Sequence, residues 1–131
     1  SPLDFSDRAL KAAQKGLRKI HHTLLRLLKT KARQAGKAAE MERQIEAFKK
    51  NFRDEMNDDF NTPKAIAVLF DFIRELNTWL DKQNIAAETV QAAIAVLKET
   101  AGSVLGLLPK DYQQLGEQGE AGLKTVVQIL I

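Results

Sequence analysis

The hydrophobic residues of this chain recur at spacings of three and four positions along most of its length. The first such series consists of Leu10, Ala13, Leu17, Ile20, Leu24 and Leu27. These spacings place side chains on one face of an α-helix, because the helix repeats every 3.6 residues. The pattern predicts a long packed helix that begins after Asp4, with Asp4 or Ser6 as the N-cap, and ends at residues 34–36.

Three further helices are predicted downstream. The second carries a narrow apolar stripe of Met41, Ile45, Phe48, Phe52 and Met56. The third follows the sequence DDFNTP, and its apolar residues from Ile66 to Leu80 cover more than half of its circumference, which favours a central helix with several neighbours. The fourth runs from about Thr89 to Leu108, because Pro109 cannot continue a helix.

These elements predict an all-α fold, an antiparallel helical bundle of four main helices over residues 1–109. No stretch shows the alternation of a β-strand. The glycine-containing residues 110–122 are interpreted as a flexible connection, and residues 123–131 as the start of a further, truncated helix. Because the apolar series from Val126 to Ile131 stops without a cap or a polar tail, we expect a fragment that leads into an absent terminal domain.

Composition narrows the class of protein. The chain has 131 residues, of which 44% are hydrophobic and 28% charged, as expected for one globular domain. It has no apolar run long enough to span a membrane and no secretory signal, so we expect a cytoplasmic monomer without membrane contact. The absence of cysteine excludes disulfides and cysteine metal sites. The adjacent His21 and His22 point about 100° apart on a helix, which disfavours a shared metal ion.

Positive charge is concentrated near the N-terminus. Residues 1–33 hold nine Lys or Arg against two Asp, and the remaining residues hold eleven against fifteen acidic residues, so a net charge of +3 divides into +7 and −4. On a helical wheel, eight residues fall within an arc of about 100° opposite the apolar face. This basic stripe consists of Arg8, Lys11, Lys15, Arg18, Lys19, His22, Arg26 and Lys29.

No acidic residue lies between Arg8 and Lys31. Ordinary solvated helix faces interleave Glu with Lys, because opposite charges four positions apart stabilise a helix. A row of like charges is instead typical of a surface that binds a polyanion. We therefore interpret the basic stripe as a candidate RNA-binding surface, part of which could face another domain instead.

The sequence DDFNTP at residues 58–63 has two interpretations, a helix start or a pair of catalytic carboxylates. Thr62 is predicted to be the N-cap, because a residue before proline is held in an extended conformation, and Pro63 suits the first helical position. Asp58 and Asp59 would lie near the positive end of the helix dipole. A catalytic pair would need a partner for proton transfer, and the sequence shows no nucleophile or metal-ligand spacing, so no catalytic residue is predicted.

The opening SPLDFSDRALKAAQKGLRKI and the later sequence MNDDFNTPKAIAVLFDFIRELN together resemble the helical (DALR-type) domain that follows the catalytic domain in bacterial cysteinyl-tRNA synthetases. The resemblance is close from Ser1 to about Asn77 and looser beyond, through Leu105–Leu108. His21 stands where many members of that family have an aromatic residue. The second motif is carried by Met56, Asp58, Asp59, Phe60, Asn61, Thr62, Pro63, Ala65, Leu69 and Phe70.

The resemblance implies a non-catalytic domain that positions tRNA. Members of this family are class I aminoacyl-tRNA synthetases that attach cysteine to its tRNA using ATP, with a zinc ion that recognises the thiol. Their ATP and zinc signatures lie upstream, so both cofactors are expected in an absent catalytic domain and no metal or cofactor is expected here. The implied partners are the tRNA for cysteine and the parent's own catalytic domain.

Two alternative functions remain open at this point. One is a ligase of the same architecture that joins cysteine to an amino sugar, although the long basic stripe argues against an enzyme without a tRNA substrate. The other is a helical protein–protein adaptor whose basic face docks on an acidic partner.

Overall fold

The computed structural model describes residues 7–31, 38–58, 61–82 and 85–109. Its elements are α1 (Asp7–Lys29), α2 (Ala38–Asn57), α3 (Thr62–Asp81), α4 (Ala87–Leu97) and a π-helical segment, η1 (Lys98–Val104), which continues α4. The described residues contain no strand, so the predicted all-α class is confirmed. The predicted caps at Asp4 and Ser6, the helix end at 34–36 and the segments 110–122 and 123–131 lie outside the described residues.

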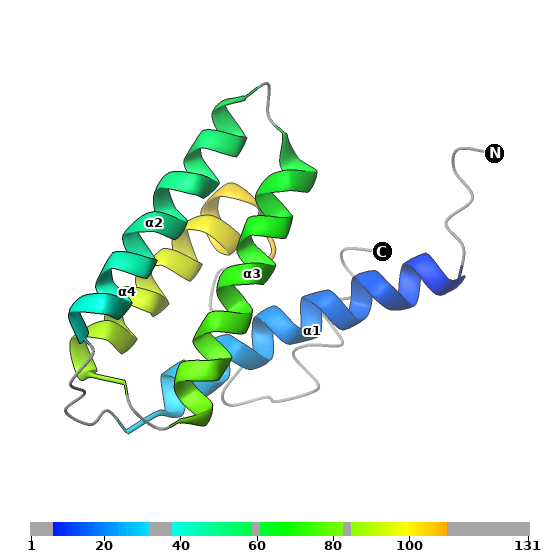
Figure 1. The fold of residues 1–131 in the computed structure, drawn as a ribbon. Helices are drawn as coiled ribbons and strands as arrows, with labels where there is room; N and C mark the ends of the chain where they lie inside the picture. Colours follow the sequence, from blue (N-terminus) through cyan, green and yellow to red (C-terminus); the bar gives the residue numbers. More distant parts are fainter. Residues whose placement is uncertain (1–6, 32–37, 59–60, 83–84, 110–131) are drawn as a thin grey trace.

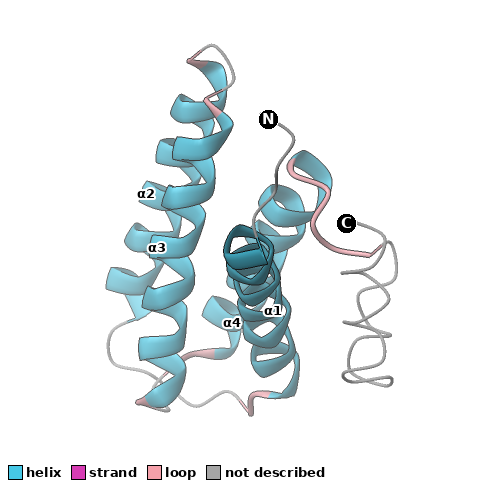
Figure 2. Ribbon diagram, turned by 90° about the vertical axis from the view of Figure 1, so that its right-hand side faces the viewer, coloured by secondary structure: helices cyan, strands magenta, loops and turns pink. Residues whose placement is uncertain are grey.

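Figure 1 shows α2 and α3 side by side and running in opposite directions, with α4 packed against α2. Helix α1 contacts α3 and α4, and it crosses α3 obliquely. Its N-terminal half projects beyond the other helices, toward the viewer of Figure 2. The bundle therefore consists of a group of three helices with a fourth laid across it.

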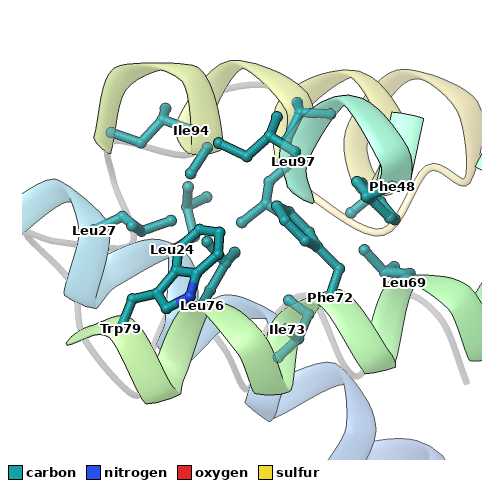
Figure 3. Packing of buried hydrophobic residues seen from close by; sticks show 14 of the residues in the cluster. Leu24, Leu27, Phe48, Leu69, Phe72, Ile73, Leu76, Trp79, Ile94 and Leu97 are labelled. Atoms are coloured by element: carbon teal, nitrogen blue, oxygen red, sulfur yellow. The ribbon is translucent and has the colours of Figure 1, made fainter. Parts of the chain in front are cut away.

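The core lies where α1, α2, α3 and α4 meet. Helix α3 packs mainly against α2 and α1, and α4 packs against the same two helices. Figure 3 shows Phe72 and Trp79 of α3 facing Leu24 of α1 and Leu97 of α4. The ring of Phe72 stacks on Phe48 with centroids 4.1 Å apart, and it meets the Trp79 ring edge-on at 6.4 Å. Burial of each such side chain contributes about 1.5–3 kcal/mol. Trp79 is 7% exposed, so it is a core residue and not a platform for a nucleobase.

The apolar face predicted for the first helix is buried only in its C-terminal half. The first buried residue of α1 is Leu17, whereas Leu10 is half-buried and Ala13 is exposed. The predicted packing of this face along the whole first helix was therefore wrong for Leu10 and Ala13. Periodicity identifies a face of a helix, but it does not tell how far along the helix other elements cover that face.

The N-cap of α3 differs from the prediction by one residue. The cap is Asn61, whose Oδ1 accepts a hydrogen bond from the Lys64 backbone N–H at 3.3 Å, while Thr62 and Pro63 are the first and second helical residues. The assignment of Thr62 as the cap and of Pro63 to the first position was therefore wrong. Asparagine caps helices at least as well as threonine, and the N–H that Pro63 lacks would have no intrahelical partner at this position.

The last described helix begins near the predicted residue and ends before Pro109. The Leu105 N–H donates to the Thr100 carbonyl oxygen at 3.0 Å, five residues back, as in a π-helix. Gly106 then adopts a positive φ of 67°, and the Leu107 N–H donates to the Ala101 carbonyl oxygen at 2.7 Å. A glycine in the left-handed conformation commonly ends a helix. Gly106, rather than the predicted Leu108-Pro109, is therefore the helix stop.

Candidate nucleic-acid interface

All eight residues of the basic stripe lie on α1, opposite the residues that α1 buries in the core. Arg26 is half-buried and the other seven side chains are exposed. From Arg8 to Lys29 the stripe spans about 30 Å, at 1.5 Å of rise per residue. Because Leu24 on the opposite face is fully buried, the stripe points away from the bundle.

Charges on α2 and α3 are partly neutralised within each helix. Lys49 pairs with Glu46 at 3.3 Å, Lys50 pairs with Asp54 at 2.9 Å, and Arg74 pairs with Asp71. Such exposed pairs stabilise a helix by only about 0.3–0.5 kcal/mol, but they cancel the local field.

In the basic stripe, within the described part of the chain, Arg26 forms the one ion pair, to Asp81 at 2.9 Å. The six remaining Lys and Arg residues have no carboxylate partner among the described residues. Their fields therefore add along one face of α1, and a face of this kind attracts polyanions.

Arg26 is held by α3. Its Nη1 donates to Asn77 Oδ1 at 2.8 Å, its Nη2 pairs with Asp81, and its side chain is 33% exposed. Contact with a phosphate would have to compete with both of these bonds. Arg26 thus belongs to the contact between α1 and α3, which local sequence cannot reveal because Asn77 lies 51 positions away.

The two adjacent histidines have different surroundings. His21 is fully buried, and its Nε2 donates to the Leu107 carbonyl oxygen at 2.8 Å, while His22 is exposed. Burial lowers the pKa of His21 from its ordinary value of 6.5, and the hydrogen bond to Leu107 partly opposes this shift. The described residues contain no group of three or more His, Cys, Asp or Glu side chains that could hold a metal ion.

The motif DDFNTP joins α2 to α3. Asp59 and Phe60 lie outside the described residues. The Asp58 N–H donates to the Asp54 carbonyl oxygen at 3.0 Å, which continues the last turn of α2. The Asn61 N–H donates to the Glu55 carbonyl oxygen at 3.1 Å.

The described residues of the motif thus end one helix and cap the next. Met56, two residues before DDFNTP, packs against the core.

Sequence reasoning missed two residues at the base of the basic stripe, Thr23 and Asn77. Thr23 is 1% exposed, and its Oγ1 accepts a hydrogen bond from Asn77 Nδ2 at 2.8 Å. A threonine at the edge of an apolar helix face and an asparagine near a helix end are both common, so neither residue alone signals this contact.

None of the described helices is both long and apolar enough to cross a membrane.

Comparison with known proteins gives a consistent result over the whole chain. Residues 51–109 match the family model of the DALR domain. The chain is 40% identical over 136 residues to a cysteine–tRNA ligase of Chlorobaculum tepidum and 37% identical over 133 residues to one of Chlorobium chlorochromatii. Both alignments cover 100% of this chain and 26% of the relative.

A cysteine–tRNA ligase of Thioalkalivibrio sulfidiphilus is 38% identical over 93% of this chain and 24% of its own length. The chain therefore spans about a quarter of the length of the curated relatives it matches. No solved structure matches.

Proposed function

We propose that this chain is the helical, non-catalytic part of a cysteine–tRNA ligase, where it positions tRNA. The whole chain aligns with about a quarter of the length of such ligases, and residues 51–109 match the DALR domain. The parent enzyme would be a class I aminoacyl-tRNA synthetase that attaches cysteine to its tRNA using ATP. The names of the relatives support tRNA ligation, and they do not support an amino-sugar ligase or a protein–protein adaptor.

The observation that supports a tRNA contact most strongly is the row of exposed cations along α1. Arg8, Lys11, Lys15, Arg18, Lys19 and Lys29 have no acidic partner among the described residues. The closely spaced phosphates of RNA would supply the missing negative charge, and the counterions they release would favour binding. Contacts of this kind orient a nucleic acid without reading its bases. We therefore assign the basic stripe, without Arg26, to positioning the tRNA backbone.

The other parts of the ligation reaction are assigned to the remainder of the parent enzyme. The residues of this chain do not fit a zinc site of the expected type, because the sequence contains no cysteine and the described residues contain no metal-binding group. ATP and zinc would be held in a catalytic domain, the second partner proposed for this chain. The parent is proposed to act as a cytoplasmic monomer.

The test uses the full-length protein that contains this chain, with Lys11, Lys15, Arg18 and Lys19 changed together to glutamine. Cysteine-dependent exchange of pyrophosphate into ATP should keep the parent rate, because this step needs no tRNA. Aminoacylation should show a KM for tRNA raised by about ten-fold or more, since up to four phosphate contacts are lost. An unchanged KM would contradict the proposed function, and so would equal loss of both activities.

A further inference from the structure

A polar network attaches α1 to α3 beside the apolar core, and Asn77 is at its centre. Asn77 Oδ1 accepts from Arg26 Nη1 at 2.8 Å, and Asn77 Nδ2 donates to Thr23 Oγ1 at 2.8 Å and to the Ile73 carbonyl oxygen at 2.9 Å. The Thr23 hydroxyl donates in turn to the Lys19 carbonyl oxygen at 2.8 Å. Two turns of α1 are thus bonded to one side chain of α3.

The chemistry of these groups fixes the orientation of the Asn77 amide. A guanidinium can only donate and a backbone carbonyl can only accept, so Oδ1 must face Arg26 and Nδ2 must face Ile73. Rotation of α1 about its axis, or a shift along it, would break these bonds and leave the buried Thr23 hydroxyl without its Asn77 donor. Hydrophobic burial itself is non-directional, so these hydrogen bonds add a specific orientation to the apolar contact between the two helices.

A second contact between α1 and α3 lies nearer the N-terminus. Gly16 approaches Phe70 so closely that a methyl group on Gly16 would lie 2.9 Å from Phe70 Cζ. This crossing lies about 10–15 Å along α1 from the polar network, at 1.5 Å per residue. Residues 7–16 include no buried residue, and Figure 1 shows that this part of α1 projects from the bundle. The two contacts therefore set the direction of the projecting half, which carries Arg8, Lys11 and Lys15.

We propose that Asn77 is a positioning residue for RNA binding. It fixes the rotation of α1 about its axis and the angle at which α1 crosses α3, so that the exposed cations of the basic stripe contact one RNA backbone at the same time. The proposal rests on the proposed function of the basic stripe. A helix held in one orientation presents its cations without paying to order them on binding. Arg26 does not contact the RNA in this proposal; its hydrogen bond to Asn77 helps to hold α1 in the orientation that binds RNA.

The first test measures tRNA binding by an Asn77→Leu variant, which keeps the size of the side chain and removes all three of its hydrogen bonds. The matched control is Thr78→Ala, because the Thr78 hydroxyl donates to the Arg74 carbonyl oxygen of its own helix and to no other group among the described residues. We expect Asn77→Leu to bind tRNA about three- to ten-fold more weakly, with a salt slope shallower by about one, and the control to match the parent. Parental affinity and slope in a folded Asn77→Leu variant would overturn the proposal. Should Asn77→Leu not fold, Asn77→Ala carries the same expectation and the same refutation.

The second test measures the orientation of α1 directly. The chain has no cysteine, so cysteines introduced by Ala12→Cys on the projecting half and Ala67→Cys on α3 are the sole attachment sites for spin labels in it. Both positions are exposed. We expect a narrow distribution of distances between the labels in the parent and in the Thr78→Ala control, and a broadened or shifted one with Asn77→Leu. An unchanged distribution would overturn a positioning role even if binding weakened.

A third variant, Lys15→Gln, separates this proposal from the proposed function. If Lys15→Gln weakens tRNA binding and Asn77→Leu does not, the stripe binds RNA without positioning by Asn77. If neither variant weakens binding, the RNA-binding role itself fails.

Discussion

His21 and Leu107 are joined by a hydrogen bond from the imidazole Nε2 to the backbone carbonyl oxygen, 2.8 Å long, across 86 positions of sequence. The bond ties the middle of α1 to the residues that follow η1. Because a carbonyl only accepts, Nε2 carries a proton. The other ring nitrogen, Nδ1, is buried without a partner among the described residues, so a neutral imidazole fits the site and a charged one does not.

This burial makes the stability of the domain depend on pH. The folded-state pKa of His21 is lowered, mainly by burial, so below its ordinary value of 6.5 the unfolded chain binds a proton that the folded chain does not. The contribution to stability is complete above pH 6.5 and is lost as pH falls from that value toward the lowered pKa. We expect the free energy of unfolding, measured in urea, to decrease over this range.

The substitution His21→Phe should remove this part of the pH dependence, because no titrating group then remains at the site. The exposed His22 provides the control, and His22→Gln should retain the dependence. A parental pH profile below pH 6.5 in the His21→Phe variant would show that another group is responsible.

The cap of α3 gives a second prediction. Asn61→Ala should lower the free energy of unfolding by about 1 kcal/mol, because the Lys64 N–H loses its acceptor. Asn61→Asp should lower it much less, since a carboxylate also accepts from that N–H. Urea titrations of these variants and of Thr62→Ala test the assignment. A larger loss for Thr62→Ala than for Asn61→Ala would return the cap to Thr62.

The close approach of Gly16 to Phe70 gives a third prediction. Gly16→Ala gains about 1 kcal/mol of helix propensity, but the added methyl forces the Phe70 ring to move. The substitution should therefore be more favourable in a Phe70→Ala background than in the parent, with a coupling of about 0.5–3 kcal/mol. Additive effects of the two substitutions on the free energy of unfolding would mean that the contact does not constrain α1.

The helical class could be predicted because it depends on local periodicity. The wide apolar arc of α3 predicts a central helix with several neighbours, whereas α3 packs mainly against α2 and α1. Which part of the first helix stays uncovered could not be predicted, because Leu10 and Leu17 occupy the same face and differ only in what the rest of the fold places over them. The choice between the adjacent residues Asn61 and Thr62 as the cap depends on energy differences smaller than sequence patterns can resolve.

The composition of the candidate interface was only partly predictable. The wheel places Arg26 with the other cations, since its angular position is correct. Its withdrawal from the exposed surface depends on Asn77 and Asp81, which the fold brings together from another helix. Gly106 is a different case, because a glycine just after a helix is a common stop signal and could have been predicted from the sequence.

The central claim, that the exposed cations of α1 bind the phosphates of tRNA, is tested most directly by the salt dependence of binding. The α1 variant changes four cations of the basic stripe to glutamine, namely Lys11, Lys15, Arg18 and Lys19. The matched control changes four cations of α2 to glutamine, namely Arg43, Lys49, Lys50 and Arg53, so that both variants lose four positive charges. For each folded variant, the affinity for the tRNA for cysteine is measured over a range of salt concentrations. The slope of log K against log salt should become shallower by about two to four for the α1 variant and should stay near the parent's for the control, since each phosphate contact contributes about 0.7–0.9. Equal slopes for the two variants would contradict the claim.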